Sequence, residues 1–380
     1  MAELNETPRG SRIHIAFFGL RNAGKSTLVN AFTGQQIAIV SDMPGTTTDP
    51  VSKAMEILPL GPCLITDTAG LDDGGELGEM RVKKSLDVLA TTDIAVWVEG
   101  GREEGRGKRE EFLDECRKRG TVVIEYKRGE DVEELKRKIA AVKLEERMPG
   151  LLDGLAKKGD RVLCIVPIDE SAPKGRLILP QQQVIRECLD KGVIVTVCGP
   201  EDLRRETEDK GRRPDLVITD SQAFGAVNQT IKQSNNQTIR LTSFSILFAR
   251  QKGDLAEYVN GLEVIKSLKD GDTVLVAEGC THHRQCNDIG TVKIPKALEK
   301  LSGKKLKFEF ASGRSFDVPA PVAGSGDGTV KLVVHCGGCM LTRREVLRRI
   351  ALAKEAGIPI VNYGLVLAMA NGLEVEDVLI

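Results

Sequence analysis

Short apolar runs alternate with longer amphipathic stretches through most of this chain, and that alternation predicts an α/β architecture with parallel sheets. The first block of alternating units starts at Ile13 and extends to about Arg147, where Met148-Pro149-Gly150 marks a break. Residues 1–11 are polar and are expected to form a tail. We therefore expect a first domain at residues 1–148.

Two further blocks repeat the alternation on a smaller scale. In the second block we expect short apolar strands at 162–166, 193–197, 216–219 and 238–241, separated by helices near 180–190, 200–209 and 221–232. In the third block we expect strands at 273–277, 331–334 and 358–361. The pattern predicts a small doubly wound sheet at residues 149–241 and another α/β domain at residues 242–380.

Composition and charge narrow the class of protein. A chain of 380 residues is long enough for two or three domains, and 41% hydrophobic residues can fill ordinary cores. The formal net charge of -1 supports neither a nucleic-acid partner nor an anionic membrane surface. No apolar run reaches the length of a membrane span, and the polar start lacks a signal-peptide core. We expect a cytoplasmic protein.

A phosphate-binding loop follows the first apolar strand. Gly19-Leu20-Arg21-Asn22-Ala23-Gly24-Lys25-Ser26 fits the pattern G-x-x-x-x-G-K-[ST], and its position between a strand and a helix argues against a chance glycine-rich turn. In such a loop the backbone N–H groups surround the phosphates, the lysine reaches the β and γ oxygens, and the serine binds Mg²⁺. The expected nucleotide-binding residues here are Gly19, Asn22, Ala23, Gly24, Lys25, Ser26 and Thr27.

Two downstream motifs complete a GTPase pattern. Asp67-Thr68-Ala69-Gly70 ends a strand, where Asp67 can hold Mg²⁺ through water and the Gly70 N–H can contact the γ-phosphate. Thr47, within a Gly-Thr-Thr loop, can bind Mg²⁺ only when a triphosphate is present. The predicted catalytic set is therefore Lys25, Thr47, Asp67 and Gly70. The three motifs resemble the translation-factor-like GTPases whose phosphate-loop Asn binds K⁺, and Asn22 takes that position.

The guanine-reading part of such GTPases is missing. A single strand, Thr121–Tyr126, precedes the last helix of the block and ends in Tyr126-Lys127-Arg128-Gly129, where Asn-Lys-x-Asp is expected. One strand–helix unit is therefore absent, and we expect weak selection of guanine. Leu71 follows Gly70 in place of a water-orienting Gln, so we expect slow hydrolysis of GTP.

Two clusters of cysteine and histidine indicate a metal centre. Cys280-Thr281-His282-His283 and His335-Cys336-Gly337-Gly338-Cys339 each follow a predicted strand, and the carboxyl ends of parallel strands converge on one crevice. A structural zinc bound by three Cys and one His and a [4Fe–4S] cluster with one labile site both fit these ligands. Cys280, Cys336 and Cys339 are the strong candidates; His282, His283, His335 and Cys286 are weaker ones, and their number favours the cluster. The other five cysteines, Cys63, Cys116, Cys164, Cys188 and Cys198, are dispersed, which argues against a disulfide framework.

Over nearly its whole length the chain resembles the HydF family, the maturation GTPases of [FeFe]-hydrogenase. The segments that carry this resemblance are GLRNAGKS, PGTTTDP, DTAG, PIDESAPKGRLILPQ, PDLVITDSQAF, LTSFSILFARQKGDL, CTHH, DIGTVKIP, HCGGCM and NYG. The resemblance implies a GTPase domain, a dimerisation domain and a domain that binds a [4Fe–4S] cluster through Cys280, Cys336 and Cys339, with His282 and His335 as the motif histidines. One departure is Thr48, where relatives of the GTPase group usually have Arg.

The resemblance also implies cofactors, a cargo and partners. It implies GTP, Mg²⁺, a monovalent K⁺ and a homodimer. The cargo is a di-iron precursor bearing CO, CN⁻ and a dithiolate bridge, which two radical-SAM maturases deliver and the apo-hydrogenase receives. Two other classes remain open from the residues alone: a ribosome- or tRNA-linked GTPase with a structural zinc, and a degenerate GTPase domain that serves only as an interaction module.

Overall fold

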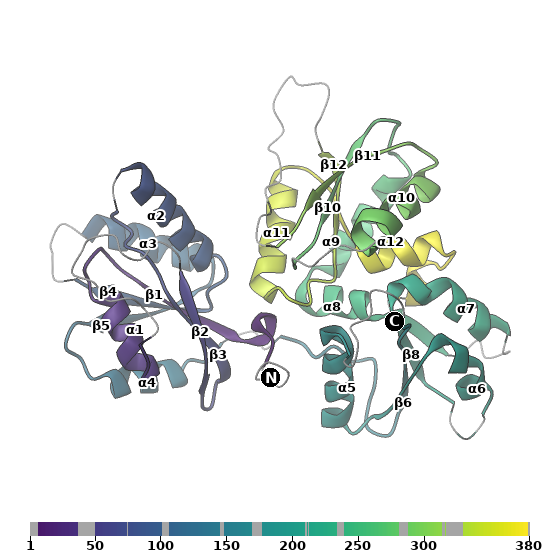
Figure 1. The fold of residues 1–380 in the computed structure, drawn as a ribbon, viewed down its shortest axis with the longest axis horizontal. Helices are drawn as coiled ribbons and strands as arrows, with labels where there is room; N and C mark the ends of the chain where they lie inside the picture. The colour runs from purple at the N-terminus through teal and green to yellow at the C-terminus, as the bar shows by residue number, and fades with distance from the viewer. Residues whose placement is uncertain are drawn as a thin grey trace. The chain divides into compact units, whose positions relative to one another are not determined.

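The computed structural model describes residues 7–36, 50–73, 75–100, 106–144, 148–168, 177–209, 211, 213–233, 239–280, 288–313, 316 and 330–378. These residues form three sheets in two compact units, Met1–Arg147 and Met148–Ile380 (Figure 1). Each sheet is covered by helices, so the α/β class expected from the alternating pattern is confirmed. None of the helices described is long and apolar enough to cross a membrane.

The first unit contains a five-stranded sheet in the order β2-β3-β1-β4-β5. Its strands are β1 (Ile13–Phe18), β2 (Val51–Ile57), β3 (Gly61–Asp67), β4 (Ile94–Glu99) and β5 (Val122–Lys127), and only β2 is antiparallel to its neighbour. Its helices are α1 (Lys25–Thr33), α2 (Glu76–Leu89), α3 (Arg106–Lys118) and α4 (Val132–Ala140). Ile15 and Phe17 pack with α1 and α4, whereas Ala16 and Phe18 pack with α2 and α3. The period of two along β1 therefore fills a core on each face.

The second unit begins with a four-stranded parallel sheet in the order β7-β6-β8-β9. The strands are β6 (Arg161–Ile165), β7 (Ile194–Cys198), β8 (Leu216–Thr219) and β9 (Arg240–Ser243). One face packs on α5 (Leu179–Lys191) and α8 (Phe244–Lys252), and the other packs on α6 (Leu203–Glu208) and α7 (Phe224–Gln233). All four strands lie within a few residues of the expected positions.

The third sheet, also parallel, has the order β11-β10-β12-β13. Its strands are β10 (Thr273–Ala277), β11 (Lys307–Ala311), β12 (Val330–His335) and β13 (Ile360–Asn362). The helices of this part are α9 (Leu255–Ile265), α10 (Ile294–Ser302), α11 (Arg343–Glu355), α12 (Tyr363–Ala370) and α13 (Val375–Val378). In Figure 1, α11 lies on one side of β10 and β12, and α10 and α12 lie on the other. The edge strand β11 is not evident from the apolar pattern.

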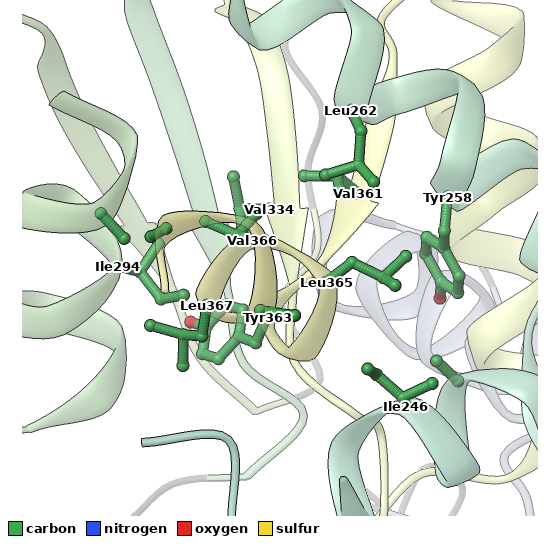
Figure 2. Close-up of a cluster of buried hydrophobic side chains, with 14 of the residues drawn as sticks. Ile246, Tyr258, Leu262, Ile294, Val334, Val361, Tyr363, Leu365, Val366 and Leu367 are labelled. Carbon is green, nitrogen blue, oxygen red and sulfur yellow. The ribbon is translucent and has the colours of Figure 1, made fainter. Parts of the chain in front are cut away.

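The second and third sheets share one hydrophobic core. It includes Val217 of β8 as well as Val334 of β12, so the two sheets of Met148–Ile380 are packed into one unit. Helix α12 is apolar on all sides and nearly all of it is buried, as expected for a helix that is enclosed by other elements. Figure 2 shows its residues surrounded by Ile294 of α10, Leu262 of α9 and Ile246 of α8. This packing fixes the strand ends that carry the cysteines.

Candidate functional site

The phosphate loop has a backbone that only certain residues tolerate. Gly19 has φ +153°, and a Cβ there would lie 2.6 Å from the carbonyl oxygen of Val98. Asn22 and Gly24 have φ values of 61° and 91°, in the left-handed region that Gly and Asn adopt most readily. The loop joins β1 directly to α1, as the sequence predicts, so its N–H groups and the helix N-terminus lie together, which suits a phosphate.

Lys25 is buried in this loop. Its ammonium donates to the carbonyl oxygens of Leu20 at 2.8 Å and of Gly19 at 3.3 Å. Burial lowers the pKa of Lys25, while the nearby Asp67, Asp72 and Asp73 oppose that shift. The ammonium is thus held inside the loop, in the place where a phosphate-binding lysine acts.

Ser26 and Asp67 form the centre of the expected Mg²⁺ site. The Ser26 hydroxyl donates to Oδ2 of Asp67 at 2.6 Å, and Asp67 is fully buried at the end of β3. Burial raises the pKa of Asp67, and the hydrogen bond from Ser26 partly offsets that effect. The second carboxylate oxygen, Oδ1, is buried and finds no partner among the residues that the structure describes. An oxygen of this kind beside a hydroxyl fits Mg²⁺ or one of its water ligands.

The Asp67–Gly70 segment packs directly against the phosphate loop. A Cβ on Gly70 would lie 2.8 Å from the backbone nitrogen of Arg21, and the Leu71 N–H donates to the carbonyl of Gly19 at 3.2 Å. The Leu71 side chain is buried and joins the core under α2 and α3, so it cannot orient a water. Thr47 and its loop lie outside the described residues. Asn22 and Thr27 are exposed, whereas Ala23 is buried.

Asp72 contacts the phosphate loop, and sequence reasoning missed it. The backbone N–H of Arg21 donates to Oδ1 of Asp72 at 2.5 Å. The carboxylate therefore lies at the loop that is expected to receive phosphate, and it acts electrostatically on Lys25. An Asp directly after Leu71 is the only signal of this contact in the sequence, because the hydrogen bond joins residues 51 positions apart.

The segment after β5 contains no guanine-reading side chain of the usual type. Asp131 is the N-cap of α4, and its carboxylate accepts from the Glu133 N–H at 3.1 Å. The Tyr126 hydroxyl donates to the carbonyl of Glu130 at 2.8 Å and closes this turn. The nearest Asp is thus engaged in capping, and α4 follows β5 directly in the described part of the chain.

The strand ends of the third sheet bring the cysteines to one edge. In the strand register Ala277 of β10 faces His335 of β12, which faces Asn362 of β13. Cys336 follows His335 directly, its N–H donates to the Ala277 carbonyl at 3.0 Å, and its Sγ accepts from the Gly279 N–H at 3.2 Å. Cys280 follows Gly279 in the same loop, so the convergence expected from parallel strands is observed.

The three thiols affect one another electrostatically. Burial raises the pKa of Cys280 to about 12, and Cys336 and Cys339 add to that rise. Burial likewise raises the pKa of Cys339 to about 11, with a further contribution from Cys336. A metal centre that bound all three as thiolates would offset this repulsion. No disulfide is present among the cysteines described.

His335 is buried, and both of its ring nitrogens have protein partners. A guanidinium nitrogen of Arg349 lies 3.3 Å from Nε2, and because a guanidinium can only donate, Nε2 accepts. Nδ1 is then protonated and donates to the carbonyl of Cys336 at 2.7 Å. Burial lowers the pKa of His335 to about 4, with Arg349 contributing. As a neutral imidazole, this ring therefore holds the cysteine loop, residues 336–341, in place. His282, His283 and Cys286 lie outside the described residues.

Arg349 of α11 is itself buried, with 1% exposure, and is fully partnered. Its Nε donates to Oε1 of Glu345 at 2.8 Å, its Nη2 donates to the Gly313 carbonyl at 2.6 Å, and its guanidinium lies 5.0 Å from the centre of the Phe316 ring. Helix α11 has Thr342 as its N-cap, and the Thr342 hydroxyl accepts from the Glu345 N–H at 3.2 Å. Burial acts to raise the pKa of Glu345, but its carboxylate pairs with Arg348 and Arg349, and together they lower it.

A second buried cation, Lys252, lies under the cysteine loop. It is the last residue of α8, it is 0% exposed, and burial lowers its pKa to about 8 while the Cys339 and Cys336 thiols oppose that shift. Sequence reasoning missed both Lys252 and Arg349. A signal existed: each occupies an apolar position of its helix, Lys252 four residues after Phe248 and Arg349 three residues after Val346.

At this edge the described residues do not form a ready-made site for a metal ion. Among the described residues, no group of three or more His, Cys, Asp or Glu side chains could hold a metal ion. Three thiols, an N–H donor to Sγ and two buried cations suit an anionic thiolate centre.

Comparison with known families divides the chain into three parts. Residues 14–142 match the model for a 50S ribosome-binding GTPase. Residues 151–253 match the model for the hydrogen maturase F dimerization domain, and residues 256–379 match that for the hydrogen maturase F tetramerization domain. The last two models cover both sheets of the second unit, including the three cysteines.

Curated GTPases match about a quarter of this chain. The tRNA modification GTPase MnmE of Endomicrobium trichonymphae is 37% identical over 91 residues, which is 23% of this chain and 19% of that protein. The GTPase Der of Campylobacter hominis is 36% identical over 88 residues, 23% of this chain and 19% of that protein. The chain thus spans about a fifth of the length of these relatives. Era from Aquifex aeolicus, solved with GDP and aluminium fluoride, aligns at 14% identity over 79% of this chain and 93% of its own, with a TM-score of 0.26.

Proposed function

The chain belongs to the hydrogen maturase F (HydF) family, and on that basis we propose that it is a scaffold GTPase that holds a [4Fe–4S] cluster and carries the di-iron precursor of the [FeFe]-hydrogenase active site to the apo-hydrogenase. Its first unit is a P-loop GTPase domain related to MnmE and Der, and this domain binds GTP. The observation that best supports the cluster is the convergence of Cys280, Cys336 and Cys339 at one edge of a parallel sheet.

We propose Cys280, Cys336 and Cys339 as the residues that would hold the cluster. When bound, such a cluster supplies an iron site at which a precursor can attach. Two sets of hydrogen bonds position the cysteine loop. The Gly279 N–H donates to the Cys336 sulfur, and His335, itself held by Arg349, donates to the Cys336 carbonyl. With both ring nitrogens engaged, His335 is better placed to orient Cys336 than to bind iron.

The cargo and the partners follow from the family and remain part of the proposal. The di-iron unit with CO, CN⁻ and a dithiolate bridge is the cargo, two radical-SAM maturases supply it, and the apo-hydrogenase receives it. The dimerization and tetramerization domains imply that the chain self-associates. We assign the homodimer contact to the second sheet, residues 149–241, because that part carries no motif of an active site.

Binding and hydrolysis of GTP would bias association with the maturases or release of the precursor. Lys25, Ser26 and Asp67 are placed for the phosphates and Mg²⁺, and Thr47 would complete the Mg²⁺ site when a triphosphate is bound. Gly70 would contact the γ-phosphate, and Asn22 would hold a monovalent K⁺. The capping role of Asp131 supports weak selection of guanine.

Metal analysis tests this proposal against a ribosome- or tRNA-linked GTPase with a structural zinc. The full chain is purified without oxygen, and iron, acid-labile sulfide and zinc are quantified together with the electron paramagnetic resonance (EPR) spectrum of the reduced protein. Iron and sulfide in equal amounts with the signal of a reduced [4Fe–4S] cluster are expected. Stoichiometric zinc, with no iron retained after reconstitution, would reject the scaffold function.

A further inference from the structure

We propose that Lys252 is a positioning residue for the cysteine loop 336–341, and that its ammonium makes a cluster bound there easier to reduce. The inference rests on the proposed function, because it presupposes a cluster on Cys280, Cys336 and Cys339. Lys252 belongs to the segment LTSFSILFARQKGDL, which identifies the family but has no role in the nucleotide site or among the cysteines.

Lys252 binds three backbone carbonyls of the cysteine loop at once and so acts as a clamp. Its Nζ donates to the carbonyl oxygens of Leu341 at 2.7 Å, Cys339 at 3.0 Å and Gly338 at 3.3 Å. An ammonium has three N–H donors, so one side chain satisfies three carbonyls of one loop and leaves no donor unused. The three acceptors are 86 to 89 residues away in sequence, so this contact is built by the fold.

This clamp sets the direction of the peptide groups. In a trans peptide the C=O and the N–H point in opposite directions, so a carbonyl turned toward Lys252 turns the next N–H away from it. The peptide between Cys339 and Met340 is held in this way, and the Met340 N–H faces the Cys339 thiol. The loop is closed by the Leu341 N–H, which donates to the Gly338 carbonyl at 3.0 Å. Hydrogen bonds to cysteine sulfurs are one of the factors that set the potential of an iron–sulfur centre.

Lys252 also differs from Arg349 in how its charge is balanced. Arg349 forms an ion pair with Glu345 at 2.8 Å, whereas within the described residues no carboxylate lies at ion-pair distance from Nζ of Lys252. A buried cation without an anionic partner is unfavourable. A cluster held by three thiolates is anionic and would supply the missing negative charge. Its reduced form carries one more negative charge, so the ammonium favours reduction.

The position of Lys252 links two parts of the second unit. Helix α8 packs on the second sheet through Phe244, Leu247 and Phe248, while its last residue reaches the cysteine loop of the third. The neighbouring Gln251 donates to the carbonyl of Pro149 at 3.0 Å, so the start of this unit is held by the same helix end. Residues matched by the dimerization model thus hold a loop that belongs to the tetramerization model.

The test uses the full chain, reconstituted without oxygen, in four forms: wild type, Lys252→Met, Lys252→Arg and Arg250→Met. Arg250 is the matched control, because it lies on the same helix and donates to the Asp153 carbonyl at 2.8 Å instead of the cysteine loop. For each form we would measure iron and sulfide content, the thermal midpoint of the apo-protein, and the midpoint potential by EPR-monitored titration.

In Lys252→Met we expect the reduction equilibrium to fall on the order of tenfold, a shift of ~59 mV to more negative potential for one electron. Lys252→Arg keeps the charge and should stay close to wild type in potential, with slower loading of iron. Arg250→Met should not change the potential. If Lys252→Met does not fold, Lys252→Gln, which keeps a donor without the charge, takes its place.

A neutral variant that loads fully at the wild-type potential would overturn the inference, even if its thermal midpoint is lower, since that result describes a purely structural lysine. An equal shift in Arg250→Met would also overturn it, because the effect would then not require contact with the loop. A wild-type chain that takes up no iron would reject the proposed function itself, and this inference with it.

Discussion

Arg349 and His335 form a buried pair in which the guanidinium donates to Nε2 of the imidazole at 3.3 Å. The other ring nitrogen donates to the carbonyl of Cys336. The guanidinium of Arg349, which forms an ion pair with Glu345 on α11, is therefore linked to the cysteine loop by hydrogen bonds through the imidazole. This arrangement fixes the tautomer of the ring. It also leaves no ring lone pair for iron without a rearrangement.

Replacing His335 by Ala should therefore weaken the fold more than the binding of iron. The substitution leaves the Cys336 carbonyl and one Arg349 donor without partners, which should lower the free energy of unfolding by about 1–3 kcal/mol. His335→Gln, whose amide both donates and accepts, should recover part of that loss. Denaturant unfolding of the apo-protein and the iron content after reconstitution measure the two effects. A stable His335→Ala protein that has lost its iron would show that the ring is a ligand.

The sequence predicts the parts of this protein that are local or strongly periodic. The loop between β1 and α1 is specified by eight consecutive residues, and buried strands such as Thr273–Ala277 stand out as continuous apolar runs. The edge strands β2 and β11 were missed, since most of their residues are exposed or half-buried and each strand contains two charged residues. These two strands lack the continuous apolar run that makes the edge strand β7 recognisable in the sequence.

The candidate site shows the same division. The cysteines could be placed at one edge from strand order alone, because parallel strands end together. Lys252 and Arg349 could not, since a basic residue at an apolar helix position either extends to water or is buried, and only the fold decides which. Their partners are carbonyls and an imidazole from distant segments. Asp72 was missed for a similar reason, because its partner is a backbone N–H.

Each of Cys280, Cys336 and Cys339 should be required for full cluster loading. Replacement by Ala removes one thiolate ligand, so we expect loss of most iron and sulfide and of the EPR signal of the reduced cluster in each variant. Cys198→Ala is the control, because Cys198 is a half-buried cysteine of β7 in a different sheet. A variant of the three that still loads like Cys198→Ala would leave that residue out of the ligand set.

Neutralising Asp72 should strengthen the binding of triphosphate. Its carboxylate accepts from the Arg21 N–H in the phosphate loop, where a γ-phosphate would meet a like charge. In Asp72→Asn we expect a gain of roughly 0.5–1 kcal/mol for a non-hydrolysable GTP analogue and a smaller gain for GDP, by isothermal titration. Asp114→Asn on α3 makes the same change of charge on an exposed surface and serves as the control. Equal or weaker analogue binding in Asp72→Asn would show that the carboxylate does not oppose the phosphate.

The first unit should lose stability as the pH falls toward 5. Burial lowers the pKa of His14, which then binds a proton less readily in the folded state than its ordinary value of 6.5 in the unfolded chain. Because the pKa of His14 is lowered in the folded state, its contribution to the free energy of unfolding is complete above pH 6.5 and decreases as the pH falls below that value. The single tryptophan, Trp97, is buried in β4, so its fluorescence reports on unfolding of this unit alone. In His14→Gln the dependence on pH between 7 and 5 should be weaker; an unchanged profile would assign it to other groups.

Hydrolysis of GTP should be slow, dependent on K⁺ and poorly selective for guanine. Leu71 is buried and cannot orient water, so without an added stabilising charge the rate should be on the order of 10⁻⁴ to 10⁻² s⁻¹. K⁺ beside Asn22 would supply part of that charge. Because Asp131 caps α4, it does not make the bidentate contact to guanine, and the loss of that contact should reduce the preference for GTP by roughly 1.5–3 kcal/mol. Phosphate release is measured with GTP and with ATP, each in K⁺ and in Na⁺, for wild type and Asn22→Ala. Equal rates in both salts would remove Asn22 from the site, and a strong preference for GTP would show that another residue between Tyr126 and Asp131 reads the base.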